Sequence, residues 1–222
     1  MRHALIFDLD GTLVDTAPDL LGATNAVLRS EGRREVDPTT LRHMVGFGAR
    51  ALIAQAFAAT GAPVEDARLP DLFDRFLVHY RAHIADASRP FPGVEETLEI
   101  LAGEGRSLGV LTNKPQPMAD LLLKALNLDR FFPVIYGAGR MSYVKPDARI
   151  FHDVVRELDA PCGIMIGDSI TDVATARAAQ APVIVVGYGY TPEPAANLGG
   201  DAVTEDFRDV PALARGLAAR ET

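Results

Sequence analysis

The chain of 222 residues has a single cysteine, which excludes an internal disulfide framework and fits a reducing compartment. It lacks an apolar run near the ~18 residues that cross a membrane, and Asp8 cuts off the first apolar run, unlike a signal peptide. Blocks of basic residues are also missing, and the formal net charge is −8, which argues against a nucleic-acid partner. We expect a cytoplasmic protein with neither a membrane nor a nucleic-acid partner, either a monomer or a homodimer.

What is present is an ordinary globular composition, with 48% hydrophobic and 23% charged residues. Short runs that are apolar on both faces predict buried strands, and amphipathic stretches between them predict helices. Strands are expected at 4–7, 108–111, 134–136, 163–166 and 183–186, and helices at 94–102, 117–126, 148–158 and 171–179. This alternation predicts an α/β fold, a doubly wound parallel-sheet, Rossmann-like core.

One long segment, residues 16–89, interrupts the alternation. It contains no convincing strand, and helical patterns occur at 19–30, 39–45, 49–59 and 70–85. We therefore expect an inserted all-helical domain at 16–89, and an α/β core formed by 1–15 together with 90–222. The chain would pass between the two at Asp15-Thr16 and at 88–90.

The first predicted strand leads directly into Asp8-Leu9-Asp10-Gly11. Ligands of open α/β sheets bind beyond the carboxyl ends of the strands, which is where both carboxylates would lie. Gly11 allows a tight turn that points backbone amides into the same space. Taken alone, the motif could equally be a plain turn between a strand and a helix.

Three further groups of polar residues occur near the ends of later strands: Thr112 with Asn113, then Lys145, then Asp168 with Asp172. Each has an ordinary alternative as a helix cap or a surface residue. Together with the first motif, they would gather several carboxylates at one sheet edge, where like charges repel unless a cation lies among them. Oxygen ligands with open positions suit Mg²⁺ and a substrate phosphate. The pattern therefore predicts phosphoryl transfer.

The four motifs, Asp-x-Asp-Gly-Thr, Thr-Asn, Lys-Pro and Gly-Asp-Ser-x-x-Asp, resemble in kind and order those of the haloacid dehalogenase-like phosphatase superfamily. The inserted helices resemble that family's movable cap. The resemblance implies that Asp8 is the nucleophile, forming an aspartyl-phosphate, and that Asp10 acts as acid and then base. It also implies that Asp8, the Asp10 carbonyl and Asp168 bind Mg²⁺, with Asp172 orienting the metal's water shell or Lys145.

The same resemblance implies that Gly11, Thr112, Asn113 and Lys145 bind the phosphate. The strings at 45–48, 91–94 and 111–115 are similar to phosphoglycolate phosphatases, which makes 2-phosphoglycolate the best candidate among small phosphorylated metabolites. Arg140 departs from the acidic residue common in that subgroup and leaves the substrate open. The alternatives are a β-phosphoglucomutase-like mutase, another sugar-phosphate or pyrophosphate phosphatase and, more distantly, a receiver-like phospho-aspartate signalling domain.

Small residues at 46–48 form a predicted loop between two helices of the insertion, and Arg50 follows it. We expect Gly46, Phe47 and Gly48 to close over the site and Arg50 to meet an anionic or polar group of the substrate. The alternative is an ordinary arginine at a helix start, exposed to solvent.

Overall fold

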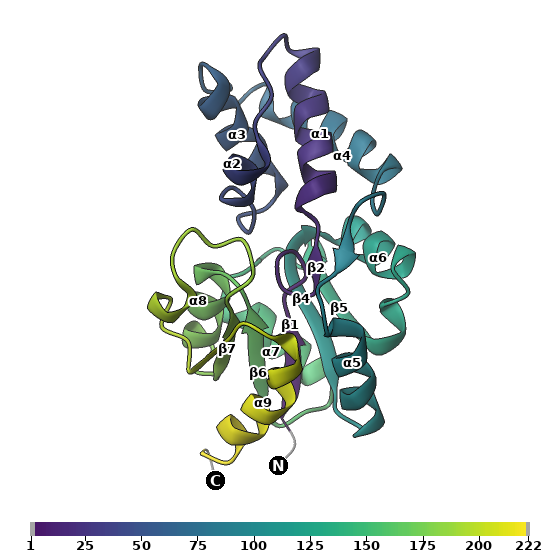
Figure 1. Cartoon of the computed structure of the whole chain (residues 1–222), viewed down its shortest axis with the longest axis vertical. Helices are drawn as coiled ribbons and strands as arrows, with labels where there is room; N and C mark the ends of the chain where they lie inside the picture. The colour runs from purple at the N-terminus through teal and green to yellow at the C-terminus, as the bar shows by residue number, and fades with distance from the viewer. Residues whose placement is uncertain (1–2, 221–222) are drawn as a thin grey trace.

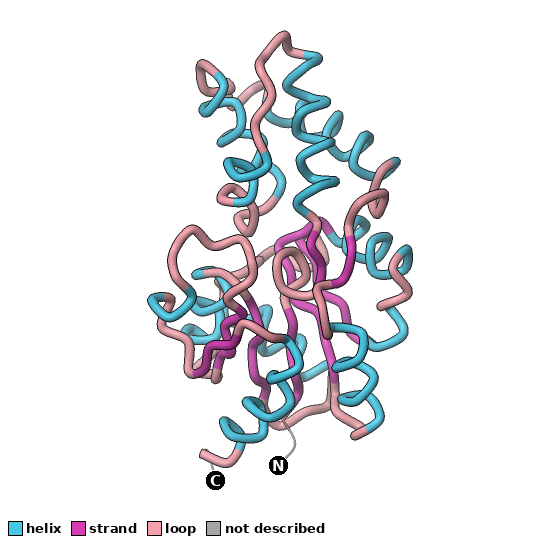
Figure 2. The backbone as a smooth tube through the Cα atoms, in the orientation of Figure 1, coloured by secondary structure: helices cyan, strands magenta, loops and turns pink. Residues whose placement is uncertain are grey.

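A six-stranded parallel sheet forms the centre of the computed structural model, which describes residues 3–220 (Figures 1 and 2). Its spatial order is β5-β4-β1-β6-β7-β8. The strands are β1 (Ala4–Phe7), β4 (Leu108–Pro115), β5 (Val134–Ala138), β6 (Gly163–Gly167), β7 (Val183–Val186) and β8 (Ala202–Thr204). The chain adds strands on one side of β1 and then crosses to the other side. The carboxyl end of β1 is therefore the switch point, where such sheets bind ligands.

Helices cover both faces of the sheet, because β1 presents apolar side chains to each face. Leu5 and Phe7 pack into one apolar cluster, and Ala4 and Ile6 into the other. The first cluster includes buried residues of α5 (Val94–Gly103), α6 (Gln116–Ala125) and α9 (Val210–Ala218). The second includes α7 (Ala148–Glu157) and α8 (Ile170–Ala178). The predicted doubly wound α/β core is confirmed.

The helical insertion leaves the core through a short antiparallel ribbon, β2 (Val14–Asp15) and β3 (Arg89–Pro90). Between these strands the chain forms α1 (Ala17–Ser30), α2 (Pro38–Arg42), α3 (Ala49–Thr60) and α4 (Leu69–Ala82). Figure 1 shows the four helices grouped at the end of the molecule away from α9. The ribbon was not predicted, because strands of two residues carry no hydrophobic pattern.

Short 3₁₀ helices at Asp129–Phe131, Ala195–Asn197 and Phe207–Asp209 complete the described secondary structure. None of the helices in residues 3–220 combines the length and the apolar character needed to cross a membrane.

Candidate active site

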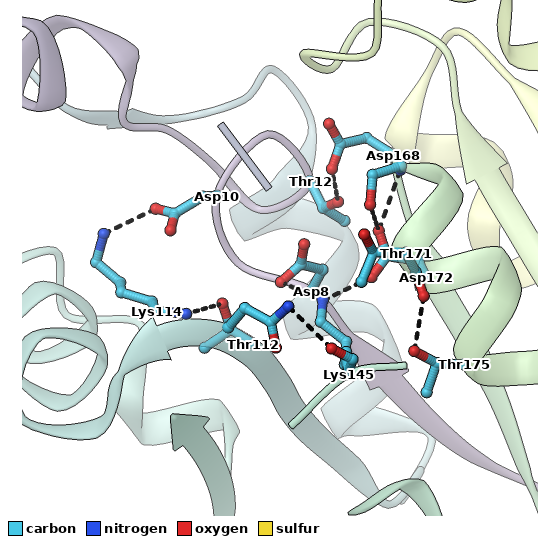
Figure 3. A network of polar contacts seen from close by, with 12 residues as sticks. Asp8, Asp10, Thr12, Thr112, Lys114, Lys145, Asp168, Thr171, Asp172 and Thr175 are labelled. Atoms are coloured by element: carbon cyan, nitrogen blue, oxygen red, sulfur yellow. Dashed lines mark hydrogen bonds and ion pairs between the residues drawn. The ribbon is translucent and has the colours of Figure 1, made fainter. Parts of the chain in front are cut away.

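Two aspartates extend the two central strands of the sheet. Asp8 follows β1 directly and Asp168 follows β6 directly, and Phe7 pairs in parallel with Ile166. Parallel pairing places the carboxyl ends of neighbouring strands at one edge, so both side chains project from it. Figure 3 shows them near Thr112 of β4 and near Lys145, which lies between β5 and α7.

An irregularity in β4 brings its polar residues to the same edge. The pairing of β4 with β5 shifts between Leu111 and Pro115, and such bulges redirect side chains near active sites. The apolar run predicts that this strand ends at Leu111. The strand instead continues to Pro115, where its backbone pairs with β5 again. Thr112 and Lys114 are buried within this stretch.

Three buried carboxylates form a compact cluster beyond β1 and β6. Asp8, Asp168 and Asp172 each offer an oxygen within 4.8 Å of the others. Lys145 Nζ lies 2.9 Å from Asp8 Oδ1, an ion-pair distance although the alignment is poor for a hydrogen bond, and donates to Asp172 Oδ1 at 2.6 Å. One ammonium does not balance three carboxylates, and hard oxygen donors suit a divalent cation. The cluster could therefore hold a metal ion.

The pKa values reflect the same excess of negative charge. Burial raises the pKa of Asp8 to about 7, against the lowering effect of Lys145, and Asp172 raises it further. Burial likewise raises the pKa of Asp168 to about 8, with Asp172 and Asp8 adding to the shift. Burial alone would lower the pKa of Lys145, but Asp172 and Asp8 outweigh it and raise that pKa. Lys145 therefore stays charged, whereas Asp8 and Asp168 take up protons near neutral pH unless a further cation offsets their charge.

Asp168 is fixed by contacts from distant parts of the chain. The Thr12 hydroxyl donates to its Oδ1 at 3.0 Å, and the Tyr190 N–H donates to its Oδ2 at 2.8 Å. A Cβ added at Gly11 would lie 2.5 Å from Asp168 Oδ2, and one added at Gly189 would lie 2.3 Å from the same atom. Both glycines are required because their backbones approach this carboxylate so closely.

Asp172 is oriented by the start of α8. Its Oδ2 accepts hydrogen bonds from Ser169 N at 3.1 Å and from Ser169 Oγ at 2.7 Å, which makes a capping box. Ser169 is therefore the N-cap, and Asp168 is not the plain helix cap of the alternative interpretation. The cap and Lys145 together hold Asp172 against the cluster.

A small cavity opens beside the cluster, between the core and the insertion. Its volume is about 40 Å³, which leaves room for only a few water molecules. The lining includes Asp8, Asp10, Thr112, Asn113 and Lys114 from the core, and Gly46, Gly48, Phe76 and Tyr80 from the insertion. A guest here must be small.

The predicted loop residues divide between two hollows. Gly46 lines the small cavity, Phe47 and Arg50 line an adjoining groove of about 330 Å³, and Gly48 lines both. The Arg50 guanidinium lies 4.5 Å from the centre of the Phe73 ring. The contact of Arg50 with substrate remains a prediction.

Two predicted phosphate ligands have their amide groups engaged locally. The Gly11 N–H donates to Val14 O at 3.0 Å within the turn. The Asn113 side-chain amide donates to Lys145 O at 3.2 Å, and Asn113 Oδ1 is buried without a hydrogen-bond partner in residues 3–220. The phosphate-binding roles of Gly11 and Asn113 remain predictions.

Asp10 is held by a lysine that the sequence motifs did not single out. Asp10 Oδ1 accepts from Thr16 Oγ1 at 2.7 Å and from Lys114 Nζ at 2.9 Å. Lys114 Nζ also donates to the Tyr80 hydroxyl of α4 at 2.6 Å. The sequence offered one signal for this role, the position of Lys114 directly after Thr112-Asn113. The contact of Lys114 with Tyr80 of α4 could not be predicted from the sequence.

Tyr190, in the loop after β7, connects the sheet edge that carries the acidic cluster to the entry of the insertion. Its hydroxyl accepts from Thr16 N at 2.6 Å and Ala17 N at 3.0 Å, and donates to Asp15 Oδ1 at 2.7 Å. Asp15 also accepts from Arg42 of α2 at 2.8 Å. A single side chain thus satisfies two backbone donors at the start of α1.

We expect Tyr190→Phe to destabilise the fold by about 2–4 kcal/mol, because two buried N–H donors lose their acceptor. Unfolding in urea would measure the change. Tyr136→Phe is a matched control, because that ring is also buried but its hydroxyl bonds only the half-exposed Glu157. An equal loss in both variants would contradict the role given to the Tyr190 hydroxyl.

A parallel α/β sheet that gathers carboxylates beyond its two central strands places this chain among the doubly wound proteins that bind ligands at that edge. Within that class, residues 5–186 match the model of the haloacid dehalogenase-like hydrolases, and the chain belongs to this family. The family predicted from the four sequence motifs is confirmed.

Similar proteins extend along nearly the whole chain. The chain is 46% identical to a phosphoglycolate phosphatase of Caulobacter vibrioides, over 93% of this chain and 88% of that protein. It is 42% identical to one of Agrobacterium fabrum, over 97% and 94%. The crystal structure of a predicted phosphoglycolate phosphatase from Haemophilus somnus superimposes with a TM-score of 0.90 at 27% identity, covering 96% of this chain and 97% of that one.

Proposed function

We propose that this protein is a Mg²⁺-dependent phosphoglycolate phosphatase that hydrolyses the ester through an aspartyl-phosphate on Asp8. The observation that carries the proposal is the position of Asp8, which belongs to the acidic cluster and also lines a small cavity together with Asp10. The 46% identity to a phosphoglycolate phosphatase supports the choice of substrate. The presence of a single cysteine in 222 residues fits a cytoplasmic enzyme.

In the first half-reaction, an Asp8 carboxylate oxygen attacks phosphorus and the bond to the leaving oxygen breaks. Asp10 donates a proton to that oxygen, so glycolate leaves as an alcohol. Thr112 Oγ1 accepts the Lys114 N–H at 3.2 Å, which leaves its own O–H to donate to a phosphoryl oxygen. Lys145, 2.9 Å from Asp8 Oδ1, neutralises charge on the nucleophile and the phosphate.

In the second half-reaction, Asp10 takes a proton from water, which attacks phosphorus and releases phosphate from Asp8. Asp8, Asp168 and the Asp10 carbonyl would hold the ion, and Asp172 would orient Lys145. When bound, Mg²⁺ would offset the repulsion between an anionic carboxylate and an anionic phosphate.

The inserted segment, residues 16–89, would act as the movable cap, with the core formed by 1–15 and 90–222. Gly46 and Gly48 line the small cavity together with Asn113 of β4, so the 46–48 loop lies beside the core. Closure of such a lid excludes water during attack.

Phosphate release from a panel of esters tests this proposal. We expect kcat/KM to be highest for phosphoglycolate, by about tenfold or more over hexose phosphates and pyrophosphate. Phosphate should be released without any bisphosphate activator. Isomerisation of a hexose phosphate, with little phosphate released, would instead identify a mutase and overturn the proposal.

A further inference from the structure

Lys114 is a buried cation in the cavity that neither the metal cluster nor the phosphate site uses. Its side chain is 2% exposed. Among the cavity-lining residues within 3–220, it is the only lysine or arginine. A buried ammonium is costly unless anionic or polar partners surround it, so its place in the cavity needs a chemical reason.

The contacts of Lys114 leave it able to bind one more group. An ammonium has three N–H donors, and two contacts are made by Lys114 Nζ, to Asp10 at 2.9 Å and to Tyr80 at 2.6 Å. Burial raises the pKa of Tyr80 to about 12, so its hydroxyl keeps a proton at neutral pH. The lysine and the tyrosine hydroxyl therefore present adjacent donors in the cavity.

The direction of the proposed reaction brings the substrate's carbon chain to this point. Attack by Asp8 places the leaving oxygen on the far side of phosphorus, and Asp10 must reach that oxygen. Figure 3 shows Asp10 and Lys114 on one side of Asp8, and Lys145, Asp168 and Asp172 on the other. The group attached to the leaving oxygen therefore lies on the side of Lys114.

We propose that Lys114, assisted by the Tyr80 hydroxyl, binds the carboxylate of the substrate and so selects phosphate esters of short hydroxy acids. This inference rests on the proposed function and names the residues that recognise its substrate. A carboxylate in a cavity of about 40 Å³ loses its water and needs a charge-assisted partner there. Arg50 lies in the adjoining groove instead, against Phe73.

The test compares phosphoglycolate with hydroxyethyl phosphate, which carries a neutral hydroxymethyl group where phosphoglycolate carries its carboxylate. We expect Lys114→Met to lower kcat/KM about 100-fold for phosphoglycolate and only a few-fold for hydroxyethyl phosphate. The loss common to both substrates measures the support that Lys114 gives Asp10. Lys124→Met is the matched control, because Lys124 is exposed on α6.

Binding without turnover gives a second readout. Phosphonopropionate, with a CH₂ group replacing the bridging oxygen of phosphoglycolate, should inhibit the wild-type enzyme far better than propylphosphonate, which lacks the carboxylate. Lys114→Met should remove this preference. If that variant does not fold, Tyr80→Phe should still lower the preference about fivefold, because the ring remains and one donor is lost.

The outcomes separate the two proposals. If wild-type enzyme shows no preference for phosphoglycolate over hydroxyethyl phosphate, the proposed function fails and this inference falls with it. If the wild-type preference is present and survives in Lys114→Met, or is lost in Arg50→Ala instead, the role of Lys114 alone is overturned.

Discussion

Asp8→Asn is expected to lower kcat for phosphoglycolate by about 10⁴-fold or more, because it removes the attacking oxygen's charge and nearly keeps the side chain's shape. Substrate binding should change much less than turnover, because the remaining phosphate-binding groups stay in place. Single-turnover measurements should detect no phosphoenzyme in the variant, whereas the wild-type enzyme should form one on this residue.

Stability measurements show whether the loss is chemical. The pKa of Asp8 is raised to about 7 mainly by burial, so its ionised form disfavours the metal-free fold near neutral pH. A neutral asparagine should therefore leave the metal-free protein at least as stable at about pH 8, with Lys145 still paired to Asp172. Asp74→Asn, on the exposed face of α4, is the control and should keep full activity. Retention of more than a few per cent of turnover in Asp8→Asn would rule out the nucleophile.

The strands that build the site could be predicted because they are buried on both faces. All four residues of β1 are buried, and so are those of β7. The edge strand β8 was missed for the opposite reason, because of its three residues only Thr204 is buried. An edge strand that short leaves no run of apolar residues to recognise.

Asp8 and Asp168 could be located from sequence because each directly follows a strand, and parallel sheets bring those ends together. Thr112 lies within β4 and Lys145 lies between β5 and α7, so strand ends alone do not account for their positions. What could not be predicted are contacts between side chains far apart in the chain. Lys114 and Tyr80 are 34 positions apart, and Tyr190 and Asp168 are 22 apart. No local pattern encodes such pairs, since they depend on how the insertion and the loop after β7 pack.

The direction of a side chain is also hidden from sequence where the backbone is irregular. The register shift in β4 decides that Lys114 enters the cavity. The direction of Arg50 is a second example. Its position beside the glycine loop can be read from the sequence, but its stacking on Phe73 depends on how α3 packs against α4. The chain has only three lysines, and the fold buries two of them, Lys114 beside Asp10 and Lys145 beside Asp8.

Chelation should reduce turnover below about 1% of its starting value, and added Mg²⁺ should restore it, because three buried carboxylates face one lysine. The same excess of charge predicts how metal affinity depends on pH. Metal can bind only to deprotonated carboxylates, and burial raises the pKa of Asp8 to about 7 and of Asp168 to about 8. Protons therefore compete with the metal across the neutral range.

The sign of this effect follows from linkage. At Asp8 and Asp168 of the metal-free protein, the folded state binds more protons than the unfolded state between about pH 4 and pH 8, so the contribution of these two groups to stability falls as the pH rises through that window. Bound Mg²⁺ replaces those protons. We expect its apparent affinity to rise at least about tenfold from pH 6 to pH 8, and its stabilising effect on Tm to be larger at the higher pH.

Calorimetric titration of Mg²⁺ at the two pH values measures the affinity, and buffers of different ionisation enthalpy count the protons released. Asp168→Asn should weaken binding strongly and release fewer protons, whereas Asp74→Asn should match the wild-type protein. Binding that is independent of pH, or that survives unchanged in Asp168→Asn, would place the ion away from this cluster. Release of about one proton or more per ion at pH 6 would instead tie the metal to the carboxylates that burial keeps protonated.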